Sequence, residues 1–235
     1  MILVIDCGNT RVKWGLHDGA GFHQVDATPL PALQRFEDAL ALIEPPAAIV
    51  VSHVANAVAK TRIERAIARF KVQPQWMTST RAAGGVVNRY DDPTKLGTDR
   101  WAAMIGAWHR HPGASVVVNC GTATTIDRLN DSGEFVGGLI IPSIGLMKKA
   151  LNENTAKLPL TDGRYVGDPR NTQDAIESGC AEATVGAIER ARVRAGAAAR
   201  LFLTGGASDI VVGLLTGPIE RIEHLTLEGL VRLRT

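Results

Sequence analysis

The 235-residue chain is predicted to fold as two similar α/β lobes, each with a mixed sheet flanked by helices. The first observation is a short, mostly β-branched run at residues 2–5, which ends in Asp6 and a polar turn. Apolar and polar residues then alternate over residues 12–16. A continuous apolar run is typical of a strand covered on both faces, and alternation with period two is typical of a second strand.

The second observation is that this strand, turn and strand return 113 positions later, with Asn119 in the place of Asp6. A chance repeat of Cys-Gly is conceivable, but matching strands on both sides of it make an internal duplication the better explanation. We therefore expect two lobes, formed by residues 1–112 and 113–235.

The third observation is the order of the remaining predicted elements. In the first lobe these are strands at 23–27, 48–51 and 75–78 and helices at 29–43 and 56–70, the second of which Asn56 caps and whose apolar residues include Val58. In the second lobe they are strands at 115–119, 124–129, 134–141 and 201–203, a helix after Pro142-Ser143 and a long helix at 172–194. An antiparallel beginning followed by helices and strands in alternation differs from a doubly wound sheet.

The first turn is predicted to bind phosphate. Gly8 and Asn9 tolerate the positive φ of a reversing turn, and further donors come from Thr10 and Lys13. Asp6 is an unusual residue at the end of a buried strand unless it faces a cation, for which the magnesium that accompanies ATP is the obvious candidate. One such motif alone is more simply a surface hairpin. Its second copy favours two turns that clamp a nucleotide.

A polar loop at residues 81–97, too rich in donors and acceptors to be core, suits a small polar substrate. A helix starts directly after it at residues 98–100, because Trp101, Met104, Ile105 and Trp108 follow the spacing of one buried helical face. Asp99 lies in the first turn of this helix. It is either a carboxylate that interacts with free N–H groups of the helix terminus or a catalytic base, and spacing alone does not choose between the two.

Composition excludes several classes of protein. The net charge is +2 and the sequence pI about 8.5, with no concentrated basic tail, which argues against nucleic acid as a partner. No signal peptide and no bilayer-spanning segment is recognisable, and three cysteines, two of them expected in loops, fit reduced thiols in the cytoplasm.

Two further stretches of the second lobe leave alternatives open. Small residues recur along the helix at 172–194, and they suit either an interface between subunits or ordinary packing within the chain. The strand at 201–203 runs into Thr204-Gly205-Gly206, where a nucleotide base could lie flat on bare backbone, although Gly-Gly alone is weak support.

Taken together and in order, the motifs resemble those of the type III pantothenate kinases, which belong to the acetate kinase, sugar kinase and actin superfamily. The motifs are Asp6-Cys7-Gly8-Asn9-Thr10, Gly97-Thr98-Asp99-Arg100, Gly121-Thr122-Ala123-Thr124-Thr125, Asn171-Thr172 and Leu203-Thr204-Gly205-Gly206. The resemblance covers essentially the whole chain.

The resemblance implies two tandem ribonuclease H-like, actin-like ATPase lobes and ATP-dependent phosphorylation of pantothenate to 4'-phosphopantothenate, the first step of coenzyme A biosynthesis. It places Asp99 as the general base. The implied ATP-binding residues are Asp6, Cys7, Gly8, Asn9, Thr10, Arg11, Val12 and Lys13, with Thr122 from the second lobe and magnesium at Asp6. The implied pantothenate-binding residues are Tyr90, Gly97, Thr98, Asp99 and Arg100, with Thr172 reaching over from the partner in a cytoplasmic homodimer.

Two positions depart from the family pattern. The family usually has aspartate where this chain has Asn119, and that carboxylate helps to hold a monovalent cation, potassium or ammonium. Pro142-Ser143-Ile144-Gly145 stands where a tighter Pro-Gly is usual. The alternatives are a superfamily kinase for another substrate and a non-catalytic ATP-binding accessory or regulatory protein, which would keep the turns but not need Asp99.

Overall fold

The computed structural model describes residues 1–160 and 162–234. The chain forms two compact units, one made of residues 1–112 with the C-terminal segment from His224 onward, and one made of Gly113–Glu223. The C-terminal segment, expected in the second lobe, packs with the first unit instead.

The first unit is built on a sheet with strand order β3-β2-β1-β4-β5. The strands are β1 (Ile2–Cys7), β2 (Arg11–His17), β3 (Phe22–Pro29), β4 (Ala48–His53) and β5 (Pro74–Trp76). The pairs β1/β2 and β2/β3 are antiparallel, and β1/β4 and β4/β5 are parallel. The predicted strands of this lobe are therefore present, with the antiparallel beginning expected from the sequence.

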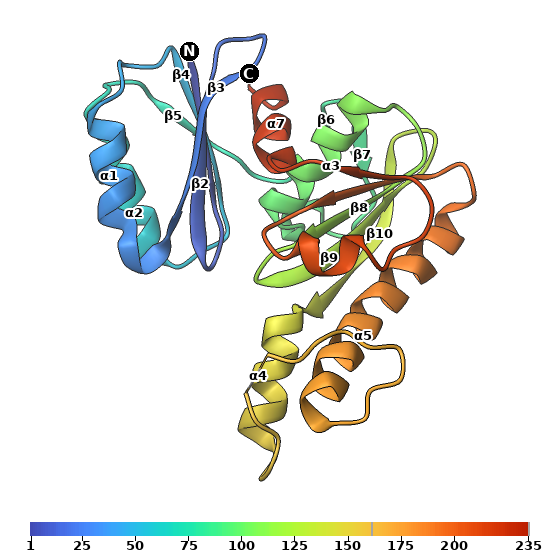
Figure 1. Cartoon of the computed structure of the whole chain (residues 1–235). Coiled ribbons are helices and arrows are strands. Elements are labelled where there is room, and N and C mark those ends of the chain that lie inside the picture. Colours follow the sequence, from blue (N-terminus) through green and yellow to red (C-terminus); the bar gives the residue numbers. More distant parts are fainter. Residues whose placement is uncertain (161, 235) are drawn as a thin grey trace. The chain divides into compact units, whose positions relative to one another are not determined.

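Helices cover both faces of this sheet. Helices α1 (Leu33–Ala41) and α2 (Ala57–Ala68) lie on one face and α7 (Leu225–Arg232) on the other (Figure 1). Asn56 caps α2 as predicted, because its side chain accepts a hydrogen bond from the Ala59 N–H. Val58 was predicted wrongly to face the core and is 70% exposed, because the buried stripe of α2 runs through Ala59, Ile63 and Ile67, about 100° around the helix.

Helix α3 (Thr98–Arg110) packs against α7 within the same unit. A Cβ at Gly229 of α7 would lie 1.8 Å from the Ala102 carbonyl oxygen, so the two helix backbones approach as closely as only glycine permits. The C-terminal segment thereby fixes α3 in the unit. The remaining elements are two 3₁₀ turns, η1 (Leu30–Ala32) and η2 (Pro93–Lys95), and a small antiparallel hairpin of β6 (Ala82–Ala83) and β7 (Val86–Asn88).

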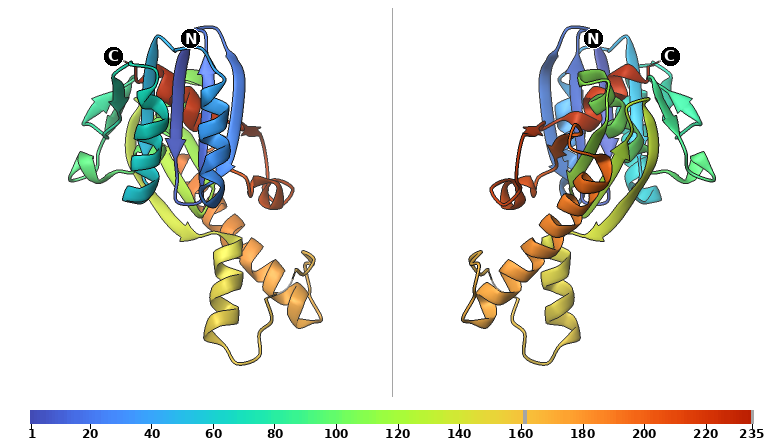
Figure 2. Two further views of the ribbon diagram at one scale, coloured as in Figure 1. Left: turned by 90° about the vertical axis from the view of Figure 1, so that its left-hand side faces the viewer. Right: turned by 90° about the vertical axis from the view of Figure 1, so that its right-hand side faces the viewer.

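The second unit repeats the plan around strands in the order β12-β11-β8-β9-β10. These are β8 (Ser115–Cys120), β9 (Ala123–Leu129), β10 (Glu134–Pro142), β11 (Arg200–Thr204) and β12 (Ile219–Arg221), with helices α4 (Ile144–Asn154), α5 (Thr172–Ala195) and α6 (Ser208–Val212). As in the first unit, the opening strand pairs antiparallel with the next strand and parallel with a later one. Helices α4 and α5 extend beyond the sheet of this unit (Figure 2).

None of the helices in the described part of the chain has both the length and the apolar composition needed to cross a membrane.

Candidate active site

Asp6 stands near the carboxyl end of the central strand β1, between two polar neighbours. In the sheet register it pairs with Lys13 of β2 on one side and with Ser52 of β4 on the other. Side chains of directly paired residues lie on the same face of a sheet, so the three polar groups gather there. The Ser52 hydroxyl hydrogen-bonds the Asp6 carboxylate.

The Asp6 carboxylate is poised for a positive partner. Its Oδ1 atom is buried and has no hydrogen-bond partner. Burial and the nearby charge of Asp99 raise the pKa of Asp6 to about 7, against the lowering effects of Ser52 and Lys13. A buried carboxylate oxygen without a partner is costly, and a bound cation would remove both the cost and the pKa shift.

Asp99 lies close enough to Asp6 for its charge to raise the pKa of Asp6, and the start of α3 is tied to the end of β4. The Thr98 and Ser52 hydroxyls are 2.9 Å apart and hydrogen-bonded, so Ser52 contacts both the strand-end carboxylate and the helix that carries the second one. Burial raises the pKa of Asp99, partly offset by the N–H of Arg100, which donates to Asp99 Oδ1, and by the charge of Arg100. Gly97 is the N-cap residue of the helix.

The first turn keeps its backbone open. The N–H of Gly8 donates to the Arg11 carbonyl oxygen over 3.0 Å, and Asn9, Thr10 and Arg11 are exposed. The prediction of positive φ at Gly8 or Asn9 was wrong, because the turn closes without it. A Cβ at Gly8 would find only the Arg11 carbonyl oxygen, at 3.7 Å, so nothing in the unit itself requires glycine there and the space beside it is open to a ligand.

Two residues of the predicted ATP-binding segment turn their side chains into the core instead. Cys7 and Val12 are fully buried among the apolar residues of the first unit, so only their backbone groups could meet a ligand. Cys7 and Cys120 end strands rather than lying in loops as expected, and all three cysteines are free. Burial raises the pKa of the Cys7 thiol to about 12 and that of Cys120 to about 11, so neither is a reactive thiolate.

Tyr90 is placed by a framework that sequence reasoning missed. The guanidinium of Arg81 donates to the carbonyl oxygens of Asn88 (2.9 Å), Tyr90 (3.1 Å) and Asp91 (3.4 Å). Asn88 was expected to lie in a polar loop outside the core and is fully buried, because its amide group donates to the Thr80 and Pro93 carbonyl oxygens and accepts from the Tyr90 N–H.

Arg100 joins this loop to α3. Its Nη1 donates to the Tyr90 hydroxyl over 3.1 Å, and its guanidinium lies 5.8 Å from the centre of the Tyr90 ring. Arg100 is only 5% exposed, so it positions Tyr90 within the protein as well as being near Asp99. Asp6, Lys13, Tyr90 and the Gly97–Arg100 segment are therefore all part of one unit, with Ser52 as an additional member. Ser52 could have been predicted from the sequence in the same way as Asp6, because it too is a polar residue at the end of a buried apolar run.

The second unit carries a matching turn. Asn119 pairs with Thr125 of β9 and with Thr204 of β11, as Asp6 pairs with Lys13 and Ser52. Gly205 follows Thr204 at φ +97°, and a Cβ there would lie 2.4 Å from the Cys120 carbonyl oxygen. The Thr204-Gly205 bend thus packs directly on the turn that contains Thr122, which is exposed.

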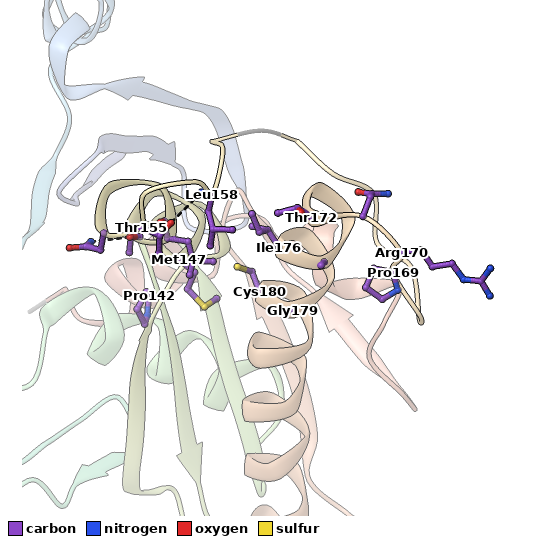
Figure 3. Close-up of a pocket in the computed structure, with 15 residues that line it drawn as sticks. Pro142, Met147, Thr155, Leu158, Pro169, Arg170, Thr172, Ile176, Gly179 and Cys180 are labelled. Atoms are coloured by element: carbon purple, nitrogen blue, oxygen red, sulfur yellow. Dashed lines mark hydrogen bonds between the residues drawn. The ribbon is translucent and has the colours of Figure 1, made fainter.

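Thr172 lies elsewhere in the second unit, on a large cavity between α4 and α5. The cavity has a volume of about 1050 Å³ and is mainly apolar, with Met147 and Leu158 facing Ile176 and Cys180 (Figure 3). None of residues 119–122 lines it. A Cβ at Gly179, on the cavity wall, would meet nothing within 4 Å, so this glycine does not serve close helix packing within this unit.

Comparison with known proteins decides the family. A model of the type III pantothenate kinase family matches residues 2–194. A type III pantothenate kinase from Aromatoleum aromaticum is 45% identical over 232 residues, covering 98% of this chain and 96% of the relative. The chain belongs to the type III pantothenate kinase family. A second member, from Nitrosospira multiformis, is 38% identical over 237 residues, covering 99% of this chain and 90% of the relative.

Solved structures establish the fold more broadly. A Campylobacter jejuni protein described as a Baf family transcriptional activator superposes with a TM-score of 0.64 at 20% identity, covering 98% of this chain and 96% of the other. Component A of (R)-2-hydroxyglutaryl-CoA dehydratase from Acidaminococcus fermentans has a TM-score of 0.58 at 15% identity, covering 99% and 95%. The type III pantothenate kinase chain thus has the actin-like ATPase and sugar kinase fold.

Proposed function

We propose that this type III pantothenate kinase transfers the γ-phosphoryl group of ATP to the primary hydroxyl of pantothenate, giving 4'-phosphopantothenate for coenzyme A biosynthesis. The observation that carries the proposal is the pair of neighbouring carboxylates, Asp6 and Asp99, at the end of a central strand beside an open glycine turn. Phosphoryl transfer needs charge neutralisation, positioning and one group that accepts the hydroxyl proton, and two carboxylates in different surroundings can divide these roles.

Asp6 is the carboxylate suited to magnesium. Its buried, unpartnered Oδ1 and raised pKa are the features that a divalent cation would relieve. Magnesium commonly binds through one or two carboxylates plus phosphate oxygens and water, so a single protein carboxylate is enough. When bound, magnesium would neutralise charge on the phosphate oxygens. Lys13 and the Asn9 N–H would hold phosphate from the protein side, since the Gly8 N–H already donates to the Arg11 carbonyl oxygen. Thr122 of the second unit stays a prediction for the same nucleotide.

Asp99 is the carboxylate suited to accept the proton. Its raised pKa brings it closer to working pH, where a general base is most effective. Arg100 beside it holds Tyr90, and Tyr90 and Arg100 together border the place where the substrate would bind. Arg81 holds the backbone of Tyr90, and Arg100 holds the Tyr90 hydroxyl. Together these three residues would orient pantothenate so that its hydroxyl faces Asp99.

The enzyme is proposed to work as a cytoplasmic homodimer. The α4–α5 cavity is mainly apolar, and two exposed apolar residues, Ile140 (62%) and Leu160 (60%), each stand two positions along the chain from a residue that lines it. A second copy of the chain is the occupant that would cover this face. Thr172 on this cavity would then be close to the partner subunit. An Ile140→Asp variant should sediment as a monomer in analytical ultracentrifugation, whereas the unchanged protein sediments as a dimer. A monomeric unchanged protein would refute this proposal.

The residue expected to help bind a monovalent cation differs from the usual family residue, because this chain has Asn119 in place of aspartate. Asn119 keeps an amide oxygen at the end of β8 but has no charge. We expect potassium or ammonium to stimulate this enzyme less than an Asn119→Asp variant, which activity measured across a series of potassium concentrations would test. Equal stimulation of both proteins would show that residue 119 does not contribute to a cation site.

The decisive experiment for the catalytic role is Asp99→Asn. Loss of a positioned base should lower kcat for pantothenate-dependent ADP release about 10²–10⁴-fold while ATP affinity, measured by calorimetry, changes little. Asp131→Asn, in an exposed turn of the second unit, is the matched control and should behave like the unchanged protein. Nearly normal turnover in the Asp99 variant would exclude the proposed role and favour the accessory-protein alternative.

A further inference from the structure

A second cavity lies within the first unit, at the opposite end of the sheet from Asp6. It has a volume of about 360 Å³ and is walled by the end of β2, the start of β3 and the last turns of α3 and α7. His17 on its wall pairs with Ile2 at the start of β1, four residues and about 13 Å along the strand from Asp6. The titratable and charged residues that line the cavity are His17, His109, Arg110, Glu228 and Arg232. None of them belongs to the proposed phosphoryl-transfer site.

His17 is a largely buried residue with one ring nitrogen open to this cavity. The side chain is only 7% exposed, and its Nδ1 accepts the Gly19 N–H over 2.9 Å. In the neutral ring the proton therefore resides on Nε2. No group in the described part of the chain accepts that proton, and Nε2 is not completely buried, so it is open to the cavity, where water or a ligand can accept from it. An occupant with an acceptor oxygen would take the place of that water.

The charge of the cavity is positive at neutral pH. Arg110 and Glu228 neutralise each other through two hydrogen bonds, of 2.6 and 2.7 Å. Arg232 is an exposed residue on the cavity wall and makes no hydrogen bond or ion pair with any residue that the structure describes. Its charge lowers the pKa of both His17 and His109, in addition to the larger effect of burial, so its guanidinium lies near both rings.

Arginines in the last turn of a helix also interact with the partial negative charge of the helix terminus, and this accounts for part of the placement of Arg110 and Arg232. It does not account for His17, which belongs to a strand, nor for the cavity beside it. The cavity therefore places a ring N–H and a positive charge on the same wall, an arrangement that suits an anion.

We propose that this cavity binds a small organic anion. Its carboxylate or phosphate group would accept from His17 Nε2 and pair with Arg232, and its carbon skeleton would pack against Phe22 and Val231, which also line the cavity. The volume is at the lower end of the range of small-molecule sites. The proposal is independent of the kinase function, since it uses none of the same residues.

The site is expected to bind more tightly at lower pH. The groups that face His17 are Asp18 from the β2–β3 turn, His23 from β3, and Glu228 and Arg232 from α7. Asp18 is already bound by His23 and by the N–H groups of Ala20 and Gly21. Arg232 also faces His109. An anion favours the protonated imidazoles, so affinity rises as pH falls through their pKa values, which lie below 6.5. One added charge about 4 Å from the anion should tighten binding about fivefold.

Imidazole NMR resonances of the full chain provide the test. Sodium sulfate, which stays a dianion, and sodium acetate are titrated at constant ionic strength against sodium chloride. We expect saturable shifts of His17 and His109 and tighter binding at about pH 5.5 than at about pH 7.5, by at most about fivefold for each imidazole that becomes protonated. Saturation by acetate alone would assign the site to carboxylates, and saturation by sulfate to phosphate-like groups.

Arg232→Gln should weaken binding about fivefold or more, because it removes the unpaired cation. Arg234→Gln is the matched control, an exposed arginine two residues further on that does not line the cavity, and it should bind like the unchanged protein. Shifts that do not saturate, shifts reproduced by chloride, or equal weakening by both variants would overturn the proposal. Urea unfolding of each variant shows that the first unit is folded.

Discussion

Replacing Asp6 by asparagine tests whether the buried Asp6 carboxylate destabilises the folded protein in the absence of a bound cation. Because the pKa of Asp6 is raised from 3.8 to about 7, the folded protein keeps a proton between these pH values that the unfolded chain has released. Stability therefore falls as pH rises through this window, and the full loss is present above about pH 7. This increase in pKa corresponds to a loss of at most about 4 kcal/mol in the free energy of unfolding. Solvent screening at the half-buried side chain reduces the expected loss to about 2 kcal/mol.

Without nucleotide or magnesium, the free energy of unfolding of Asp6→Asn should be about 2 kcal/mol larger than that of the unchanged protein near pH 8. This difference should vanish near pH 4. The assay is urea unfolding followed by circular dichroism across this pH range, with Asp131→Asn as the control that shows no such change. Magnesium with a non-hydrolysable nucleotide should stabilise the unchanged protein and not the Asp6 variant. A variant that is less stable than the unchanged protein near pH 8, or that keeps the same pH dependence, would refute the reasoning.

Three further predictions concern the framework around this pair. Ser52→Ala should raise the pKa of Asp6 further, because the hydroxyl lowers it, and move the acidic limb of the kcat/KM pH profile upward; a uniform loss at every pH would contradict this. Arg81→Met should raise KM for pantothenate about tenfold with KM for ATP within about twofold in steady-state kinetics, and equal effects on both would contradict a role in placing the substrate loop. Gly205→Ala should cost about 2 kcal/mol or more in urea unfolding, since its φ of +97° and its close neighbour disfavour a Cβ, whereas Gly213→Ala, in open surroundings, should cost less; equal costs would contradict the packing described.

Local patterns were sufficient for much of the first unit. The apolar run at residues 2–5, the alternation after the turn and the Asn56 cap each express a preference that the chain satisfies within a few residues, and the structure has each of them. Asp6 was recognisable because a carboxylate after a buried strand conflicts with its surroundings. The neighbouring position of Asp99 followed only from the family resemblance.

What the sequence did not reveal depends on contacts between distant residues. Asn88 has a polar side chain and is nevertheless fully buried, because groups of three other residues satisfy it. Ser52 becomes part of the site through the parallel register of β1 and β4 and through Thr98. The C-terminal segment joins the first unit because Gly229 packs on Ala102, more than a hundred residues earlier, and no local pattern encodes that pairing.

The most direct test of the central claim is phosphorus NMR of the purified chain with ATP, magnesium and pantothenate. The account predicts that a phosphomonoester resonance of 4'-phosphopantothenate grows in step with ADP and that ADP formation stops when pantothenate is left out. ATP that stays intact with pantothenate present, or ADP that forms equally without it, would contradict the account.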